Sequence, residues 1–153
     1  MIRIGLISDT HGLLRPEAVE RLRGAAHIVH AGDIGGEAVL AGLRALAPLT
    51  AVRGNNDQVP WARAVRDTET VTLAGVRVHV LHDLAGLDID PAAQGVRVVV
   101  SGHSHRPHIE ERAGVLYVNP GSAGPRRFKL PIAVARLEIE GAEVRARIEE
   151  LVP

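Results

Sequence analysis

The apolar run Ile2-Arg3-Ile4-Gly5-Leu6-Ile7-Ser8 passes directly into Asp9-Thr10-His11 at the start of the chain. Such a run is typical of a buried β-strand, and the residues after it carry a carboxylate and an imidazole, which are both metal ligands. In an open α/β sheet, polar residues just beyond the carboxyl ends of the strands converge on one crevice, where ligands bind. This stretch therefore indicates both the type of sheet and the place of a candidate site.

Four more apolar runs end in the same kind of residue. The residues that follow them are Gly32-Asp33, Gly54-Asn55-Asn56-Asp57, His82-Asp83 and Gly102-His103-Ser104-His105. A lone Asp-x-His or Gly-Asp is more often a turn or a helix cap than a ligand. Five strand ends of this kind instead predict a metal site assembled from most of the chain, in preference to scattered, solvated polar loops.

The order of the expected elements indicates an α/β fold. In the first half, strands alternate with a helix from Pro16 to about Gly24 and a helix over about Glu37 to Ala47. This order predicts parallel strands joined by right-handed crossovers. The second half is richer in strands, and three hairpins, one short helix and one very apolar strand are expected there. They span 68–81, 108–118 and 132–148 for the hairpins, 90–95 for the helix and 96–100 for the strand.

Length and composition bound the class of protein. At 153 residues, with 46% hydrophobic and 24% charged residues, the chain is expected to form a single globular domain over 1–153. We expect a cytoplasmic protein with no membrane partner, because Met1 to Thr10 is typical of a strand and not of a secretory signal. Zero cysteines exclude thiolate metal sites. A net charge of zero and 2% aromatic residues do not indicate a nucleic-acid partner.

The residues at the strand ends form a mixed nitrogen and oxygen donor set. Such a set suits manganese, iron, zinc, nickel or cobalt, and not calcium or an iron–sulfur cluster. Seven ligands are too many for one catalytic ion that keeps an open position, so they fit two ions that share a bridging carboxylate. Two ions about 3.5–4 Å apart stabilise in-line displacement at phosphorus. The seven residues are Asp9, His11, Asp33, Asn55, His82, His103 and His105.

The charge balance of such a centre favours an anionic substrate. Two divalent ions bring four positive charges, and Asp9 and Asp33 cancel two of them. The remainder favours a hydroxide between the ions and an anionic phosphate. A chain without net charge is therefore expected to carry a local, phosphate-seeking cationic pocket.

The same ordered residues, followed by Asn119-Pro120-Gly121-Ser122, resemble the calcineurin-like metallophosphoesterase superfamily, and its small bacterial and archaeal phosphodiesterases most of all. The resemblance covers Met1 to about Arg127. It implies a four-layer α-β-β-α sandwich, in which two packed mixed sheets are flanked by helices. It also implies a hydrolase with two divalent transition metal ions, for which manganese is favoured, with nickel, zinc, iron or cobalt as alternatives.

By resemblance, one ion is held by Asp9, His11, Asp33 and His105. The other is held by Asp33, Asn55, His82 and His103, with Asp33 as the bridge. The resemblance further implies a phosphodiesterase in which a metal-bridging hydroxide attacks phosphorus. Asp33, Asn55 and His103 would be its catalytic residues.

Two departures from the family pattern bear on activity. Many members have Gly-Asn-His-Glu, whose His assists the leaving group, where this chain has Asn56-Asp57. Activated esters or diesters are therefore expected to be better substrates than ordinary monoesters. The smaller relatives also have His-Gly-His where this chain has His82-Asp83-Leu84, so Asp83 adds an acid near the metals.

Several interpretations stay open on the sequence alone. Asn56, Asp57 and Arg126 are candidates for contact with substrate, although Arg126-Arg127 also fits an exposed charged loop. His30 is either a packed strand histidine or a support for the ligands. The alternatives for function are a phosphomonoesterase or nucleotidase, and a non-catalytic, metal-stabilised protein-interaction module. A homo-oligomer formed through the late strands is a further open alternative.

Overall fold

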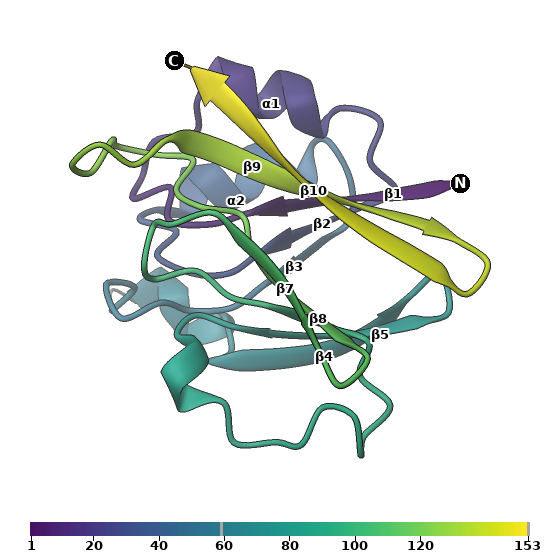
Figure 1. Cartoon of the computed structure of the whole chain (residues 1–153). Coiled ribbons are helices and arrows are strands. Elements are labelled where there is room, and N and C mark those ends of the chain that lie inside the picture. Colours follow the sequence, from purple (N-terminus) through teal and green to yellow (C-terminus); the bar gives the residue numbers. More distant parts are fainter. Residues whose placement is uncertain (59, 153) are drawn as a thin grey trace.

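The first strand, β1 (Ile2–Ile7), lies at the centre of a five-stranded sheet in the computed structural model, which describes residues 1–58 and 60–152 (Figure 1). The strand order is β10-β9-β1-β2-β3. Strands β1, β2 and β3 are parallel, and β9 and β10 extend the sheet in antiparallel fashion. The predicted alternation of parallel strands and helices is confirmed. The other four strands are β2 (His27–His30), β3 (Leu49–Ala51), β9 (Ile132–Glu140) and β10 (Glu143–Val152).

The second half of the chain supplies another five-stranded sheet, with the order β4-β5-β6-β8-β7. Its three central strands, β5, β6 and β8, are parallel, whereas β4 and β7 are antiparallel to their hairpin partners. All three predicted hairpins are therefore present. The strands are β4 (Thr68–Leu73), β5 (Val76–Leu81), β6 (Val98–Val100), β7 (His108–Arg112) and β8 (Val115–Asn119).

The two sheets pack face to face because their strands alternate between two buried faces. In β1, Ile4 and Leu6 join the core between the sheets, whereas Ile7 packs on the side of the helices. Helices α1 (Pro16–Leu22) and α2 (Glu37–Arg44) cover that outer face of the first sheet, each ending slightly before the predicted residue (Figure 1). The 3-10 helix η1 (Pro60–Ala64) brings Trp61 against the same cluster.

The outer face of the second sheet has a thinner cover. The 3-10 helix η2 (Leu84–Gly86) and the loop after it pack on Leu81 and Val99. The short helix expected at 90–95 is wrong: these residues form successive turns, closed by the bond from the Val96 N–H to the Pro91 carbonyl at 2.9 Å. The fold class is nevertheless the predicted one, with two packed mixed sheets flanked by helices.

This topology brings the carboxyl ends of six parallel strands together. The ends meet through backbone bonds such as Asp9 N–H to the Gly32 carbonyl and Ala123 N–H to the Ser8 carbonyl, both at 3.0 Å. The strand ends that the sequence predicts to carry metal ligands thus lie together where the two sheets meet. Within residues 1–58 and 60–152, no helix is long and apolar enough to cross a membrane.

Candidate metal centre

The carboxylate of Asp9 lies fully buried where the two sheets meet. Its Oδ2 atom accepts hydrogen bonds from the Ser8 hydroxyl at 2.8 Å and from the His103 backbone N–H at 3.1 Å. Its Oδ1 atom is buried and has no hydrogen-bond partner among the described residues. Burial raises the pKa of Asp9, although the bond from Ser8 opposes that effect. Burial of a carboxylate oxygen without a hydrogen-bond donor costs free energy, so we expect this atom to bind a cation.

Three imidazoles surround that oxygen. The Nε2 atom of His105 lies 3.5 Å from Asp9 Oδ1, and those of His11 and His82 each lie 3.9 Å away. The Nε2 atoms of His11 and His105 are themselves 3.3 Å apart. Two nitrogens bound at about 2.0–2.1 Å to one tetrahedral ion lie about 3.4 Å apart. The spacing of these atoms therefore fits ligands of a shared ion.

Asp33 supplies the second carboxylate. Its Oδ1 accepts the Asn56 backbone N–H at 2.9 Å and its Oδ2 accepts the Asn56 side-chain amide at 3.2 Å. The same Oδ2 lies 3.3 Å from His82 Nε2 and 3.7 Å from His11 Nε2. Burial alone would raise the pKa of Asp33, but the nearby His82 imidazole and the hydrogen bond from Asn56 outweigh it and lower that pKa to about 2. Asp33 is therefore ionised, and its Oδ2 faces the imidazoles of both His11 and His82.

The orientation of the His82 ring suits a metal ligand. Its Nδ1 lies 2.8 Å from the Ala31 carbonyl, so that nitrogen carries the proton and donates it. In the neutral ring, the lone pair is then on Nε2, which is buried without a hydrogen-bond partner and faces both carboxylates. A backbone carbonyl on the far nitrogen is the usual arrangement behind a ligating histidine. Burial, together with the charges of Arg127 and His11, lowers the pKa of His105 to about 4, so that ring is neutral. Burial also lowers the pKa of His82, but Asp33, the Ala31 carbonyl and Asp9 outweigh it and raise that pKa above its usual value.

Two groups of side chains among the described residues lie close enough together to hold a metal ion. One consists of Asp9, His11 and His105, the other of Asp9, Asp33 and His82, and in each group the ligand atoms lie within 4.8 Å of one another. Asp9 belongs to both groups, and its Oδ1 approaches histidines of each. Asp33 Oδ2 also approaches a histidine of each group. The residues present thus fit divalent metal ions.

The backbone is strained at this centre. Asp9, His11, Asp33, His103 and His105 all have positive φ angles, between 47° and 73°. Left-handed backbone is uncommon for residues other than glycine, and such strain concentrates at functional sites, where the surrounding structure enforces it. The ligands therefore lie on tight turns that aim their side chains across the sheet ends.

Two glycines permit the close approach of these turns. A Cβ on Gly54 would overlap the Asp33 carboxylate, and a Cβ on Gly102 would overlap Ser8 and the Asp9 carboxylate. Glycine is thus required at positions 54 and 102, because any larger residue would collide with the Asp33 or Asp9 carboxylate.

Two expected ligands lie outside the buried groups. The His103 ring stands perpendicular to that of His82 with 5.2 Å between centroids, and its side chain is 47% exposed, with Nε2 3.8 Å from Asp83 Oδ2. Asn55 is exposed, and it is the neighbouring Asn56 whose amide reaches Asp33. The structure therefore brings together five of the seven expected ligands and leaves His103 and Asn55 at the rim.

The expectation that Asp57 contacts the substrate does not agree with its position in the structure. The sequence suggested contact with substrate, but Asp57 is only 1% exposed, and its carboxylate accepts the backbone N–H groups of Ile34, Gly35 and Gly54, each at 3.0 Å. It therefore ties the turn of Asp33 to the turn of Asn55. Arg126 is exposed, and its Nη1 lies 3.5 Å from the Leu130 carbonyl.

Other residues support the ligands in ways that the sequence did not determine. His30 is fully buried and bonds to Thr10 and to the Gly32 N–H. Asn119 donates to the Gly102 carbonyl at 2.9 Å and accepts the Gly121 N–H at 2.9 Å, which connects the loop after β8 to the turn at Gly102 beside the site. The sequence signal for His30 was its position next to a strand end, and that for Asn119 was the motif Asn119-Pro120-Gly121-Ser122.

Comparisons with known proteins agree with this geometry. Residues 2–142 match the family model of the calcineurin-like phosphoesterase superfamily domain. A probable metallophosphoesterase from Methanothermobacter thermautotrophicus is 34% identical over 157 residues, which cover 95% of this chain and 90% of that protein. The chain therefore belongs to the calcineurin-like metallophosphoesterase family, as its strand ends predicted.

Solved structures share the fold. An archaeal phosphodiesterase superposes with a TM-score of 0.79 at 25% identity, covering 97% of this chain and 100% of the other. Vps29 from Entamoeba histolytica, in a complex with zinc, superposes with a TM-score of 0.74 at 21% identity, covering 99% and 100%. The fold therefore occurs both in a phosphodiesterase and in Vps29.

Proposed function

We propose that this protein is a dinuclear metal-dependent phosphodiesterase. The observation that carries the proposal is Asp9 Oδ1, a buried carboxylate oxygen that no described donor satisfies and that three imidazoles surround. Family membership supports phosphoester hydrolysis, and the archaeal phosphodiesterase with a similar fold supports the diester. When bound, two divalent ions would make water nucleophilic near neutral pH and stabilise charge on the phosphoryl oxygens.

The chain's own residues would hold and orient this centre. Asp9, His11 and His105 would hold one ion, and Asp33 with His82 the other, with Asn55 and His103 approaching from the rim. Asp33 Oδ2 is suited to the bridging role, because it lies 3.3 Å and 3.7 Å from imidazoles of the two groups. Ala31 and Ser8 fix the orientation of His82 and Asp9 through hydrogen bonds.

The residue at position 56 bears on which esters can be cleaved, because it is not a proton donor for the leaving group. Where many family members carry a histidine that assists the leaving group, this chain has Asn56, which cannot donate an acidic proton. The adjacent Asp57 is also unsuited to that task, since three backbone N–H groups occupy its buried carboxylate. Esters whose leaving group is stable as an anion are therefore the expected substrates.

A protein-interaction module is the second candidate. It is favoured by the rim positions of Asn55 and His103, which leave the buried ligand set smaller than the expected seven. The likeness to Vps29 adds that this fold occurs outside archaeal phosphodiesterases. In this alternative, the metals would stabilise the fold and no ester would be turned over.

Hydrolysis of bis(p-nitrophenyl) phosphate by chelator-stripped protein tests the proposal. Manganese, nickel, zinc or magnesium is added back, and bound metal is counted by elemental analysis. We expect turnover to return together with two transition ions per chain. Two bound ions without turnover of any mono- or diester would favour the interaction module. Failure to bind metal would overturn both.

The two rim asparagines are separated by a matched pair of variants. If Asn55 moves onto an ion, Asn55→Ala lowers the affinity for the second ion, whereas Asn56→Ala only removes a hydrogen bond to Asp33. If Asn56→Ala has the larger effect on metal affinity, the ligand assigned to Asn55 by resemblance is wrong.

A further inference from the structure

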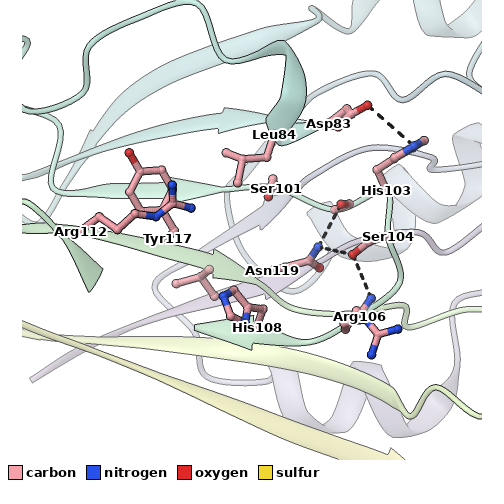
Figure 2. Close-up of a pocket in the computed structure, with 12 residues that line it drawn as sticks. Asp83, Leu84, Ser101, His103, Ser104, Arg106, His108, Arg112, Tyr117 and Asn119 are labelled. Atoms are coloured by element: carbon pink, nitrogen blue, oxygen red, sulfur yellow. Dashed lines mark hydrogen bonds and ion pairs between the residues drawn. The ribbon is translucent and has the colours of Figure 1, made fainter. Parts of the chain in front are cut away.

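A cavity of about 400 Å³ adjoins the metal centre on the side of the second sheet. Figure 2 shows it between η2, which carries Leu84, and strands β7 and β8, which carry Arg112 and Tyr117. The volume lies within the range of about 300–1,000 Å³ that is usual for small-molecule sites. The cavity is therefore large enough for an organic group of nucleoside size.

The cavity and the metal centre share a wall. Gly102 and His103 line the cavity, and the backbone N–H of His103 is bonded to Asp9 Oδ2. The His103 ring also stands 5.2 Å from that of His82. A phosphate held at the metals would thus place one of its ester substituents beside His103, at the mouth of the cavity.

The lining suits an aromatic group with polar edges. Leu84, Tyr117 and Val118 provide apolar surface, and the Arg112 guanidinium lies 4.5 Å from the centre of the Tyr117 ring. This stacked pair forms a flat wall at the end of the cavity away from His103 (Figure 2). Planar rings and guanidinium groups are the surfaces on which nucleobases stack.

The charges of the lining point the same way. Among the described residues that line the cavity, Arg106 and Arg112 are cationic and only Asp83 is acidic. Asp83 is turned toward His103, and its Oδ1 also accepts the Ala85 N–H. Arg112 donates from Nε to Glu110 Oε2 at 3.1 Å, so it offers mainly the flat face that stacks on Tyr117. Arg106 is the cation that can reach a carbonyl edge of a base or a phosphate oxygen.

We propose that this cavity binds the nucleoside of a nucleotide diester whose phosphate lies at the metal centre. The inference rests on the proposed phosphodiesterase function and adds the class of substrate. A simple alkyl substituent would leave the Arg112–Tyr117 wall uncovered, so the enzyme should select for a nucleoside.

Two diesters with the same leaving group test this selection. Thymidine 5′-(p-nitrophenyl) phosphate and methyl p-nitrophenyl phosphate both release p-nitrophenolate, so their kcat/KM ratio reports the non-leaving group alone. We expect the nucleoside diester to be favoured by about tenfold or more, the size of one stacking contact. Equal values of kcat/KM would overturn the inference, and cleavage of neither diester would instead overturn the phosphodiesterase.

Variants of the flat wall locate the effect. Tyr117→Ala and Arg112→Gln should each lower the ratio toward one, and Arg112 is exposed, so its variant is not expected to disturb folding. Arg145→Gln is the matched control, because Arg145 is an exposed arginine that is paired with Glu143 on β10 and does not line the cavity. A ratio that stays the same in both wall variants would place the selective contact elsewhere.

The only tyrosine of the chain offers a readout that does not need turnover. Protein labelled with 3-fluorotyrosine gives a single fluorine resonance, from position 117. Titration with thymidine 5′-monophosphate should shift it saturably in the metal-loaded protein, and inorganic phosphate at equal concentration should shift it far less. The absence of a nucleotide-specific shift would contradict the inference even if diesters are cleaved.

Discussion

The Nε2 atom of His30 lies 3.0 Å from the hydroxyl of Thr10, and this bond joins the ends of β1 and β2 directly behind the metal ligands. Gly32 donates its N–H to His30 Nδ1 at 3.0 Å, so the proton of the neutral ring is on Nε2 and is donated to Thr10. The Thr10 hydroxyl in turn donates to the Ile34 carbonyl at 2.7 Å. The turns that carry Asp9, His11 and Asp33 are thereby fixed relative to one another.

The burial of His30 makes stability depend on pH. Burial lowers the pKa of His30 from 6.5 to about 3, so between these values the unfolded chain binds a proton that the folded chain does not. Stability is therefore intact above pH 6.5 and is lost as the pH falls toward 3. Urea unfolding of chelator-treated protein should show His30 contributing a loss of about 2 kcal/mol between about pH 7 and about pH 5.

His30→Gln isolates this contribution. The variant lacks the titrating ring, so its stability should fall less steeply with acid than that of the unaltered protein, although it starts lower by about 1–2 kcal/mol because the hydrogen bonds are weakened. His27 and His79, whose pKa values burial also lowers, are present in both proteins and do not affect the difference. Parallel pH profiles would mean that His30 is not the buried neutral group.

Asp57 should matter for stability. Asp57→Ala leaves the N–H groups of Ile34, Gly35 and Gly54 without their acceptor, which should cost about 3 kcal/mol of unfolding free energy. Asp67→Ala is the control, because Asp67 is an exposed acid paired with Arg53, and a change below about 1 kcal/mol is expected. Denaturant titration checks both. Full stability of Asp57→Ala together with loss of activity would restore the substrate role expected from the sequence.

Gly54 should be required for metal binding. A Cβ at this position overlaps the Asp33 carboxylate, so Gly54→Ala must displace the acid and lower metal affinity by at least about tenfold. Gly36→Ala is the matched change, since a Cβ at Gly36 meets nothing within 4 Å and its φ of 174° is extended. Calorimetric titration with manganese measures the difference. Equal affinities would show that the turn at Gly54 yields without moving Asp33.

Asp33→Asn should abolish turnover and weaken the binding of both ions. The substitution keeps the shape of the side chain but removes the negative charge that lies between His11 and His82. Elemental analysis should find fewer than two ions per chain. Asp83→Asn, at an exposed acid near His103, should keep two ions bound. Near-normal activity of Asp33→Asn would contradict its assignment as the shared ligand.

Much of the architecture was readable in the sequence. Strand ends at Asp9, Asp33, His82 and His105 were predictable because buried strands are continuous apolar runs and their ends are sharp. The hairpins followed from their turn residues. The helix expected at 90–95 failed because local pattern could not decide between a helix and successive turns over so few residues.

The sequence by itself determined which residue types gather at the ends of the strands, since buried strands are apolar runs and the carboxyl ends of parallel strands share one edge of the sheet. Only the tertiary structure decided which contacts the side chains in the loops after those strands make. It placed Asn56 and not Asn55 on Asp33, enclosed Asp57 among backbone amides and opened the cavity beside His103. These outcomes depend on the volume and the hydrogen-bond partners available where the two sheets meet. Residues that are distant in the sequence provide both the volume and the partners.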